Sequence, residues 1–163
     1  MRAFELLVSR FQRRIYALAV RMLGSAAEAE DVVQDVFITA WRRLPDIRED
    51  AAFVGWLYKT ATNRCLALLR KRRPQVELDT ERHASGLVEH DPERSVEVSG
   101  QLDALAEALQ HLPAQQRACW LLREAHGRSY EEIASLVGAS PDAVRGRIAR
   151  ARVELARMMR SWH

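Results

Sequence analysis

Apolar residues recur every three or four positions through most of this sequence, which is the period of an amphipathic α-helix. The first such segment runs from Phe4 to Met22 and is closed by Gly24. Ser25 and Glu28 then have the spacing of a capping box, so a second helix is expected to begin there. Its predicted core-facing residues are Val32, Val33, Val36, Phe37, Ala40, Trp41 and Leu44.

A third helix is predicted from Ala51 to Arg72, after a loop at Pro45 to Asp50 where the helical pattern is broken. Its expected core residues are Phe53, Leu57, Ala61, Cys65 and Leu68. From Gln75 to Val98 the composition inverts, with seven acidic residues against two arginines. That composition is typical of a flexible, solvated linker.

The pattern resumes with leucines at helical spacing from Leu102 to Leu112, and Pro113 begins a further helix that is expected to end at Gly127. The sequence therefore predicts an all-α fold of two small helical domains, 1–74 and 99–163, joined by a flexible acidic linker at 75–98. Seven glycines and five prolines are too few for a turn-rich β protein.

The last helical pair has the signature of a helix-turn-helix. Ser129 and Glu132 form a second capping box, and Gly138 supplies the positive φ that ends a short helix. Ser140 can cap the next helix, with Pro141 at its first position. A short helix, a glycine-containing turn and a second helix predict a helix-turn-helix over residues 129–152.

The second helix of this motif has a core side made of Val144, Ile148, Ala151 and Leu155. The small or short side chains of Asp142, Gly146 and Ala149 lie opposite and form a slim ridge. Four arginines flank that ridge: Arg145, Arg147, Arg150 and Arg152. Such a ridge suits a helix in the DNA major groove, although a solvated basic helix would have the same periodicity.

Two further surfaces are candidates for binding. Residues 59–73 include six basic and no acidic side chains. Trp56, Tyr58 and Asn63 lie toward the beginning of the same predicted helix, and the combination can hold phosphates and unpaired bases. A solvated helix C-terminus would also be basic. The outer stripe of the second helix is polar around one isoleucine and is either a partner surface or a solvent face: Asp31, Gln34, Asp35, Ile38 and Arg42.

Several function classes lack their signatures. The sequence has no phosphate-binding glycine loop, no HExxH motif and no nucleophile elbow, and its five histidines are scattered, so we expect neither an enzyme nor a metal or cofactor site. Cys65 and Cys119 have no paired neighbour and are expected to be reduced core residues. Without a signal peptide or a membrane-spanning apolar run, we expect a soluble, cytoplasmic protein with no membrane insertion.

Three segments together resemble a known family: Ala29 to Leu44 (AEDVVQDVFITAWRRL), Phe53 to Pro74 (FVGWLYKTATNRCLALLRKRRP) and the terminal helix-turn-helix. They look like the extracytoplasmic-function (ECF) sigma factors, the minimal sigma-70 group that keeps only regions 2 and 4. The resemblance implies an alternative sigma factor that binds core RNA polymerase and directs initiation at specific promoters. An anti-sigma factor is a further partner that family habit suggests, although no residue identifies one.

For the first domain, the resemblance implies that the outer stripe of the second helix docks on the clamp helices of the polymerase β′ subunit. The same domain would open the −10 element and hold a flipped base. The −10 residues so implied come from the loop before the third helix and from that helix: Asp46, Ile47, Arg48, Trp56, Lys59, Asn63, Arg64 and Arg70.

For the second domain, the resemblance implies contact with the polymerase β flap and readout of the −35 element by the helix that begins at Pro141. The residues so implied are Ser140, Asp142, Arg145, Gly146, Arg147, Ala149, Arg150 and Arg152. Gly146 and Ala149 stand where the family often has larger side chains, which shifts the expected readout to Asp142, Arg145 and Arg150. The main alternative is a stand-alone helix-turn-helix regulator, followed by an RNA-binding protein.

Overall fold

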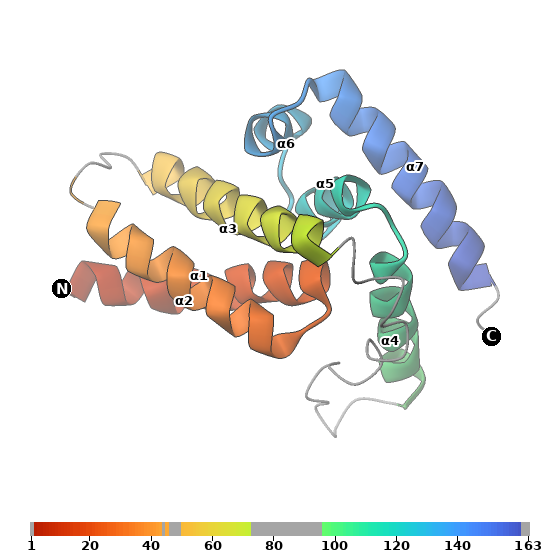
Figure 1. Ribbon diagram of the computed structural model, residues 1–163, viewed down its shortest axis with the longest axis horizontal. Coiled ribbons are helices and arrows are strands. Elements are labelled where there is room, and N and C mark those ends of the chain that lie inside the picture. The colour runs from red at the N-terminus through yellow and green to blue at the C-terminus, as the bar shows by residue number, and fades with distance from the viewer. Residues whose placement is uncertain (1, 44, 46–49, 73–95, 161–163) are drawn as a thin grey trace.

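The computed structural model describes residues 2–43, 45, 50–72 and 96–160, and within them it is all helical (Figure 1). The seven helices are α1 (Arg2–Leu23), α2 (Ala26–Arg43), α3 (Asp50–Arg72), α4 (Val96–Gln110), α5 (Ala114–Glu124), α6 (Tyr130–Val137) and α7 (Pro141–Arg160). The all-α prediction is thus confirmed for this part of the chain. Leu44, Asp46, Ile47, Arg48 and most of the predicted linker lie outside it. α4 begins at Val96 and includes the last three residues assigned to the linker.

Helices α1, α2 and α3 pack on one another as an N-terminal module. Ile15, Leu18, Val36 and Leu57 are fully buried at their centre, as the helical periodicity predicts. Trp41 corrects the prediction, because it is 48% exposed rather than in the core. It lies near the end of α2, where the edge of its ring meets Phe4 with centroids 5.0 Å apart and leaves the rest of the indole uncovered.

Helices α4 to α7 form a C-terminal module around α5 and α7. The predicted helix-turn-helix is confirmed. Ser129 Oγ accepts a hydrogen bond from the Glu132 amide (3.1 Å) and the Glu132 carboxylate accepts one from the Ser129 amide (3.3 Å). Gly138 ends α6 with φ 69°, a conformation that a side chain disfavours. Ser140 Oγ then accepts from the Ala143 amide (3.1 Å) and caps α7.

The two modules pack against each other, which the sequence did not predict. α3 lies between the α1–α2 pair and helices α5 and α6, while α7 follows the outer edge (Figure 1). Arg117 of α5 is 5% exposed and donates hydrogen bonds to the carbonyl of Met22 at the end of α1. It also donates to the carbonyls of Leu109 (2.7 Å), Gln110 (3.0 Å) and Leu112 (3.0 Å) at the end of α4. One buried guanidinium therefore donates to carbonyls at the C-terminal ends of two helices, one in each module.

A second contact between the modules joins α3 to the turn after α5. The Tyr58 hydroxyl lies 3.0 Å from Nδ1 of His126, and the two rings meet edge to face with centroids 5.3 Å apart. Burial, reinforced by the positive charges of Arg128, Arg21 and Arg14, lowers the pKa of His126 to about 4. His126 is therefore neutral near pH 7 and can share a hydrogen bond with the phenol.

Candidate nucleic-acid and partner interfaces

The predicted ridge of α7 is present on the outer side of the molecule. Val144, Ile148, Ala151 and Leu155 are buried, while Asp142 and Ala149 are exposed on the opposite face. The Arg150 guanidinium lies over Gly146, where an added Cβ would meet its Nη1 at 3.5 Å, an ordinary van der Waals contact. The ridge is therefore low, and Arg150 lies across it.

The four arginines of α7 divide into two groups. Arg145, Arg150 and Arg152 are exposed. Arg145 pairs with Asp142 one turn earlier (Nη1–Oδ1 2.8 Å), and Arg152 pairs with Glu124 of α5 (Nη2–Oε1 2.5 Å), a hydrogen bond that raises the pKa of Arg152.

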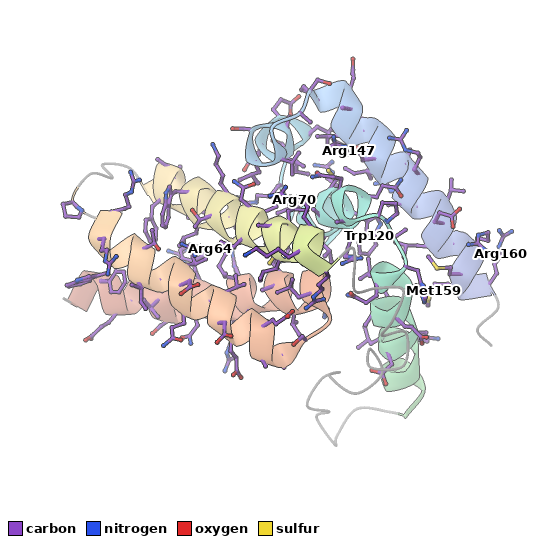
Figure 2. All side chains as sticks on the ribbon, in the orientation of Figure 1. Arg64, Arg70, Trp120, Arg147, Met159 and Arg160 are labelled. Carbon is purple, nitrogen blue, oxygen red and sulfur yellow. The ribbon has the colours of Figure 1, made fainter. Side chains whose placement is uncertain are left out.

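Arg147 is different. It is half-buried on the α5 side of α7 and donates to the Gln115 side chain at 3.3 Å (Figure 2). Of the four arginines, Arg147 is thus the one that is half-buried, and its contact with Gln115 joins α7 to α5.

On α3, the predicted nucleic-acid residues share one face. Trp56, Lys59, Asn63 and Arg70 follow helical spacing, and the last three are exposed. The Trp56 ring is half-buried and stacks near Phe53, with centroids 6.4 Å apart. Tyr58 corrects the prediction, because it is 1% exposed and cannot stack with a base. Its position around the helix axis directs the side chain toward α5 and α6 rather than toward solvent.

The basic segment 59–72 of α3 contains no acidic residue, but two of its arginines form ion pairs with acidic residues of α2. Arg64, labelled in Figure 2, lies 3.4 Å from Asp35 of α2 and donates to Thr39 Oγ1 at 3.0 Å. Arg72 pairs with Glu28 and donates to the Leu23 carbonyl at 2.7 Å, and burial lowers its pKa. These two arginines therefore tie α3 to α2 and α1, whereas Lys59 and Arg70 stay exposed.

The polar stripe of α2 is fully on the surface. Its residues are exposed, as the helical period requires: Asp31, Gln34, Asp35, Ile38 and Arg42. Beside it lies an apolar groove of about 940 Å³ between α1 and α2. Sequence analysis missed this groove, which is lined in part by Phe4, Val8, Tyr16, Val33, Phe37, Ile38 and Trp41. The signal was available, because Phe4, Val8 and Tyr16 repeat at multiples of four residues along α1.

Both cysteines are free and buried, as the sequence predicts. Burial raises the pKa of Cys65 to about 12 and also raises that of Cys119, so neither thiol is an activated nucleophile. Within the described residues, no three His, Cys, Asp or Glu side chains are grouped so as to hold a metal ion. No helix in that same part of the chain has the length and apolar character needed to cross a bilayer.

The chain matches two family models in succession: Sigma-70 region 2 over residues 7–75 and Sigma-70 region 4 over residues 102–155. It is 38% identical over 162 residues to the RNA polymerase sigma-H factor of Pseudomonas aeruginosa. It is 37% identical over 160 residues to the ECF RNA polymerase sigma-E factor of Escherichia coli K12. Each alignment covers 93% of this chain and 83% of the relative.

Solved structures agree with this assignment. CnrH, determined in complex with the cytosolic domain of CnrY, is 31% identical with a TM-score of 0.71, over 99% of this chain and 90% of CnrH. The sigma factor RpoE of Bartonella quintana, determined with the anti-sigma factor NepR, shares the fold with a TM-score of 0.79 at 23% identity, over all of both chains. The chain therefore belongs to the sigma-70 family, as an ECF sigma factor built from regions 2 and 4.

Proposed function

We propose that this chain binds core RNA polymerase and divides promoter recognition between its two modules. Residues 1–74 act as region 2, which docks on the polymerase and opens the −10 element. Residues 99–163 act as region 4, which reads the −35 element, and residues 75–98 connect them. The observation that carries this proposal is the outer face of α7, a low ridge between exposed arginines on a helix whose other face is buried.

The −35 element is a duplex, and α7 has the shape to enter its major groove. Asp142 on the ridge, Arg150 across it and Arg145 beside it are proposed to meet the base edges. The small side chains of Ser140, Gly146 and Ala149 allow the backbone to come close. Arg152, farther along the helix, is positioned for phosphates. Arg147 can contact DNA only if its hydrogen bond to Gln115 breaks when DNA binds.

The −10 element must be held as a single strand. Lys59 and Arg70 can follow its backbone, and the amide of Asn63, exposed between them, can hydrogen-bond an unpaired base. Flipping a base costs a few kcal/mol, which contacts within the pocket have to offset. Trp56, Arg64 and the preceding segment with Asp46, Ile47 and Arg48 complete the proposed site.

Polymerase docking is proposed on the outer stripe of α2. Asp31, Gln34 and Asp35 supply acceptors, and Ile38 joins the stripe to the apolar groove against α1. A polar stripe beside an apolar groove suits the helical hairpin of the polymerase β′ clamp. The C-terminal module is proposed to reach the β flap. The chain acts in the bacterial cytoplasm and lends these surfaces to the polymerase, which performs the catalysis.

A protein antagonist is also proposed. The CnrH relative was solved with the cytosolic domain of CnrY bound, and a partner of that kind would compete with polymerase for this chain.

The test is reconstitution with purified core polymerase. We expect the full chain to make core enzyme start transcripts at specific sites and to bind duplex promoters weakly by itself. A stand-alone regulator would do the reverse, because it binds duplex half-sites without polymerase. Tight, sequence-specific duplex binding by the free chain, with no new transcript start in the presence of core enzyme, would overturn the proposal.

A further inference from the structure

The first residue of α6, Tyr130, lies among arginines that come from two other helices. The guanidinium carbon of Arg123, on α5, is 4.6 Å from the centroid of the Tyr130 ring. That of Arg145, on α7, is 5.0 Å from the same centroid. Both distances are within the range in which an aromatic ring attracts a cation. The ring thus links the start of the helix-turn-helix to the DNA-facing side of α7.

The ring itself has a fixed place. Tyr130 directly follows Ser129, whose capping box with Glu132 sets the start of α6. The side chain is half-buried and packs against the core of the module. Arg123 is held as well, because its Nη1 donates to the Arg128 carbonyl at 3.0 Å. Arg145 therefore packs against a ring that is itself held by the core of the module.

Arg145 is restrained from two directions. Its Nη1 lies 2.8 Å from Asp142 Oδ1, one turn earlier on α7, and its guanidinium lies over the Tyr130 ring. An exposed arginine otherwise samples many rotamers and loses that freedom when it binds. Two contacts that leave donors free orient the guanidinium before DNA arrives.

We propose that Tyr130 is a positioning residue for base readout, because it holds Arg145 in the orientation that reads the −35 element. This inference rests on the proposed function and adds to it a residue outside the recognition helix. The aromatic face performs the role, and the hydroxyl is not required for it. The contribution of the ring belongs to specificity at the bases that Arg145 reads, whereas the Tyr130 hydroxyl interacts with Arg152, a proposed phosphate contact.

The experiment uses polymerase holoenzyme reconstituted with the full chain and a promoter panel in which each −35 base pair is replaced in turn. Initial transcript yield is measured for the wild type, Arg145→Ala, Tyr130→Leu and Tyr130→Phe. Arg145→Ala identifies the base pairs that this arginine reads. We expect Tyr130→Leu to reduce discrimination at those same base pairs by roughly two- to fivefold, the value of an exposed cation–π contact.

Two variants guard against a merely structural effect. Tyr130→Phe keeps the ring and should keep the wild-type preference. Tyr130→Gln removes the ring with a polar residue of good helix propensity, and it should reproduce Tyr130→Leu. Circular dichroism of each variant checks that the helical content is unchanged. In the double variant of Tyr130→Leu with Arg145→Ala, discrimination should be no lower than with Arg145→Ala alone, since the ring acts through that arginine.

The contrary results are distinct. An equal loss of transcription on every promoter in the ring-deleting variants would mean that Tyr130 contacts phosphate or only stabilises the fold. A loss of preference in Tyr130→Phe would assign the effect to the hydroxyl. An Arg145→Ala variant without position-specific change would remove the reader that Tyr130 is meant to position. Failure of the proposed function looks different, because then wild-type holoenzyme starts no promoter-specific transcript.

Discussion

Helices α3 and α7 both carry a cluster of basic residues, yet the arginines of the two helices have different surroundings. On α3, Arg64 and Arg72 pair with Asp35 and Glu28 of α2, so that part of the apparent cationic surface stabilises the module itself. On α7, Arg145, Arg150 and Arg152 are exposed, although Arg145 pairs with Asp142 of the same helix and Arg152 with Glu124 of α5. Clustering of charge along a helix therefore predicts a binding surface only where neighbouring helices leave the cluster uncovered.

Because Arg64 and Arg72 are paired within the module, the surface of α3 that is proposed to bind single-stranded DNA has fewer residues than the sequence predicts. Lys59, Asn63 and Arg70 remain exposed on one face of α3. The duplex surface, in contrast, keeps most of its predicted members and loses only Arg147 to a contact with Gln115. The predictions below test this contrast between arginines that hold the protein together and arginines that face outward.

The largest effect is expected at the most buried arginine. Arg117→Ala removes the donor for carbonyls of α1 and α4 and should lower the free energy of unfolding by about 3–5 kcal/mol, because each lost charge-assisted bond counts for roughly 1.5–3 kcal/mol. Arg70→Ala, on the exposed face of α3, is the matched control and should change it by less than about 0.5 kcal/mol. Urea unfolding followed by circular dichroism measures both. Equal, small changes would show that Arg117 is not a structural tie.

The contact between modules should also depend on pH through His126. Its pKa of about 4 in the folded chain lies below the ordinary value of 6.5. As pH falls through this window, the unfolded chain takes up the proton first, so stability is full above pH 6.5 and declines toward pH 4. The expected loss is about 2 kcal/mol between pH 7.5 and pH 5.

The variant His126→Gln isolates this contribution, because glutamine does not titrate. It should lose less stability than the wild type over the same pH interval, in urea titrations of both proteins at matched ionic strength. Protonation of carboxylates affects the two proteins alike and cancels in the comparison. Parallel pH curves for the two proteins would mean that His126 is free to protonate in the folded chain.

On α7, readers and phosphate contacts should separate. Arg150→Ala should reduce preference at particular −35 base pairs by roughly 1–3 kcal/mol if the contact is bidentate. Arg152→Ala, which loses its pair with Glu124 and a phosphate contact, should weaken all promoters about equally. Footprinting of holoenzyme on a panel of −35 variants measures both. If the two substitutions give the same profile, Arg150 is not a base reader.

The fold was largely predictable because its signals are local. The capping box at Ser129, the positive φ at Gly138 and the apolar side of α7 each depend on neighbours within a few positions, and each is present in the structure. Trp41 was placed wrongly because the length of the opposing helix, rather than periodicity, decides whether the end of a stripe is covered.

The interfaces were less predictable because they join distant residues. Arg117 meets Met22 across 95 positions, and His126 meets Tyr58 across 68. No period or motif in the sequence pairs such residues. The groove between α1 and α2 likewise depends on how the two helices are placed relative to each other. The apolar residues that line it are nevertheless recognisable in the sequence of each helix.

The smallest expected effect is at the Asp35–Arg64 pair, which joins the proposed docking stripe to α3. The Asp35 side chain is 62% exposed and that of Arg64 is 38% exposed, so their coupling should be only about 0.2–1 kcal/mol in a double-mutant cycle with Asp35→Asn and Arg64→Gln. Asp35→Arg should nevertheless weaken binding to core polymerase clearly, while its stability changes by less than about 0.5 kcal/mol. Co-purification with core enzyme is the measurement. Undiminished binding of the Asp35→Arg variant to core polymerase would show that the stripe is only a solvent-exposed face.

The central claim, that α3 acts on single strands and α7 on the duplex, is tested most directly with Asn63→Ala and Arg150→Ala in holoenzyme. The measurement is permanganate reactivity of −10 thymines alongside footprinting of the −35 element. Asn63→Ala should lower the thymine signal and spare the −35 footprint, and a promoter mismatched across −10 should restore the signal by removing the unpairing cost. Arg150→Ala should weaken the −35 footprint first. Equal loss of both signals in both variants, with no rescue by the mismatched promoter, would contradict the division of labour.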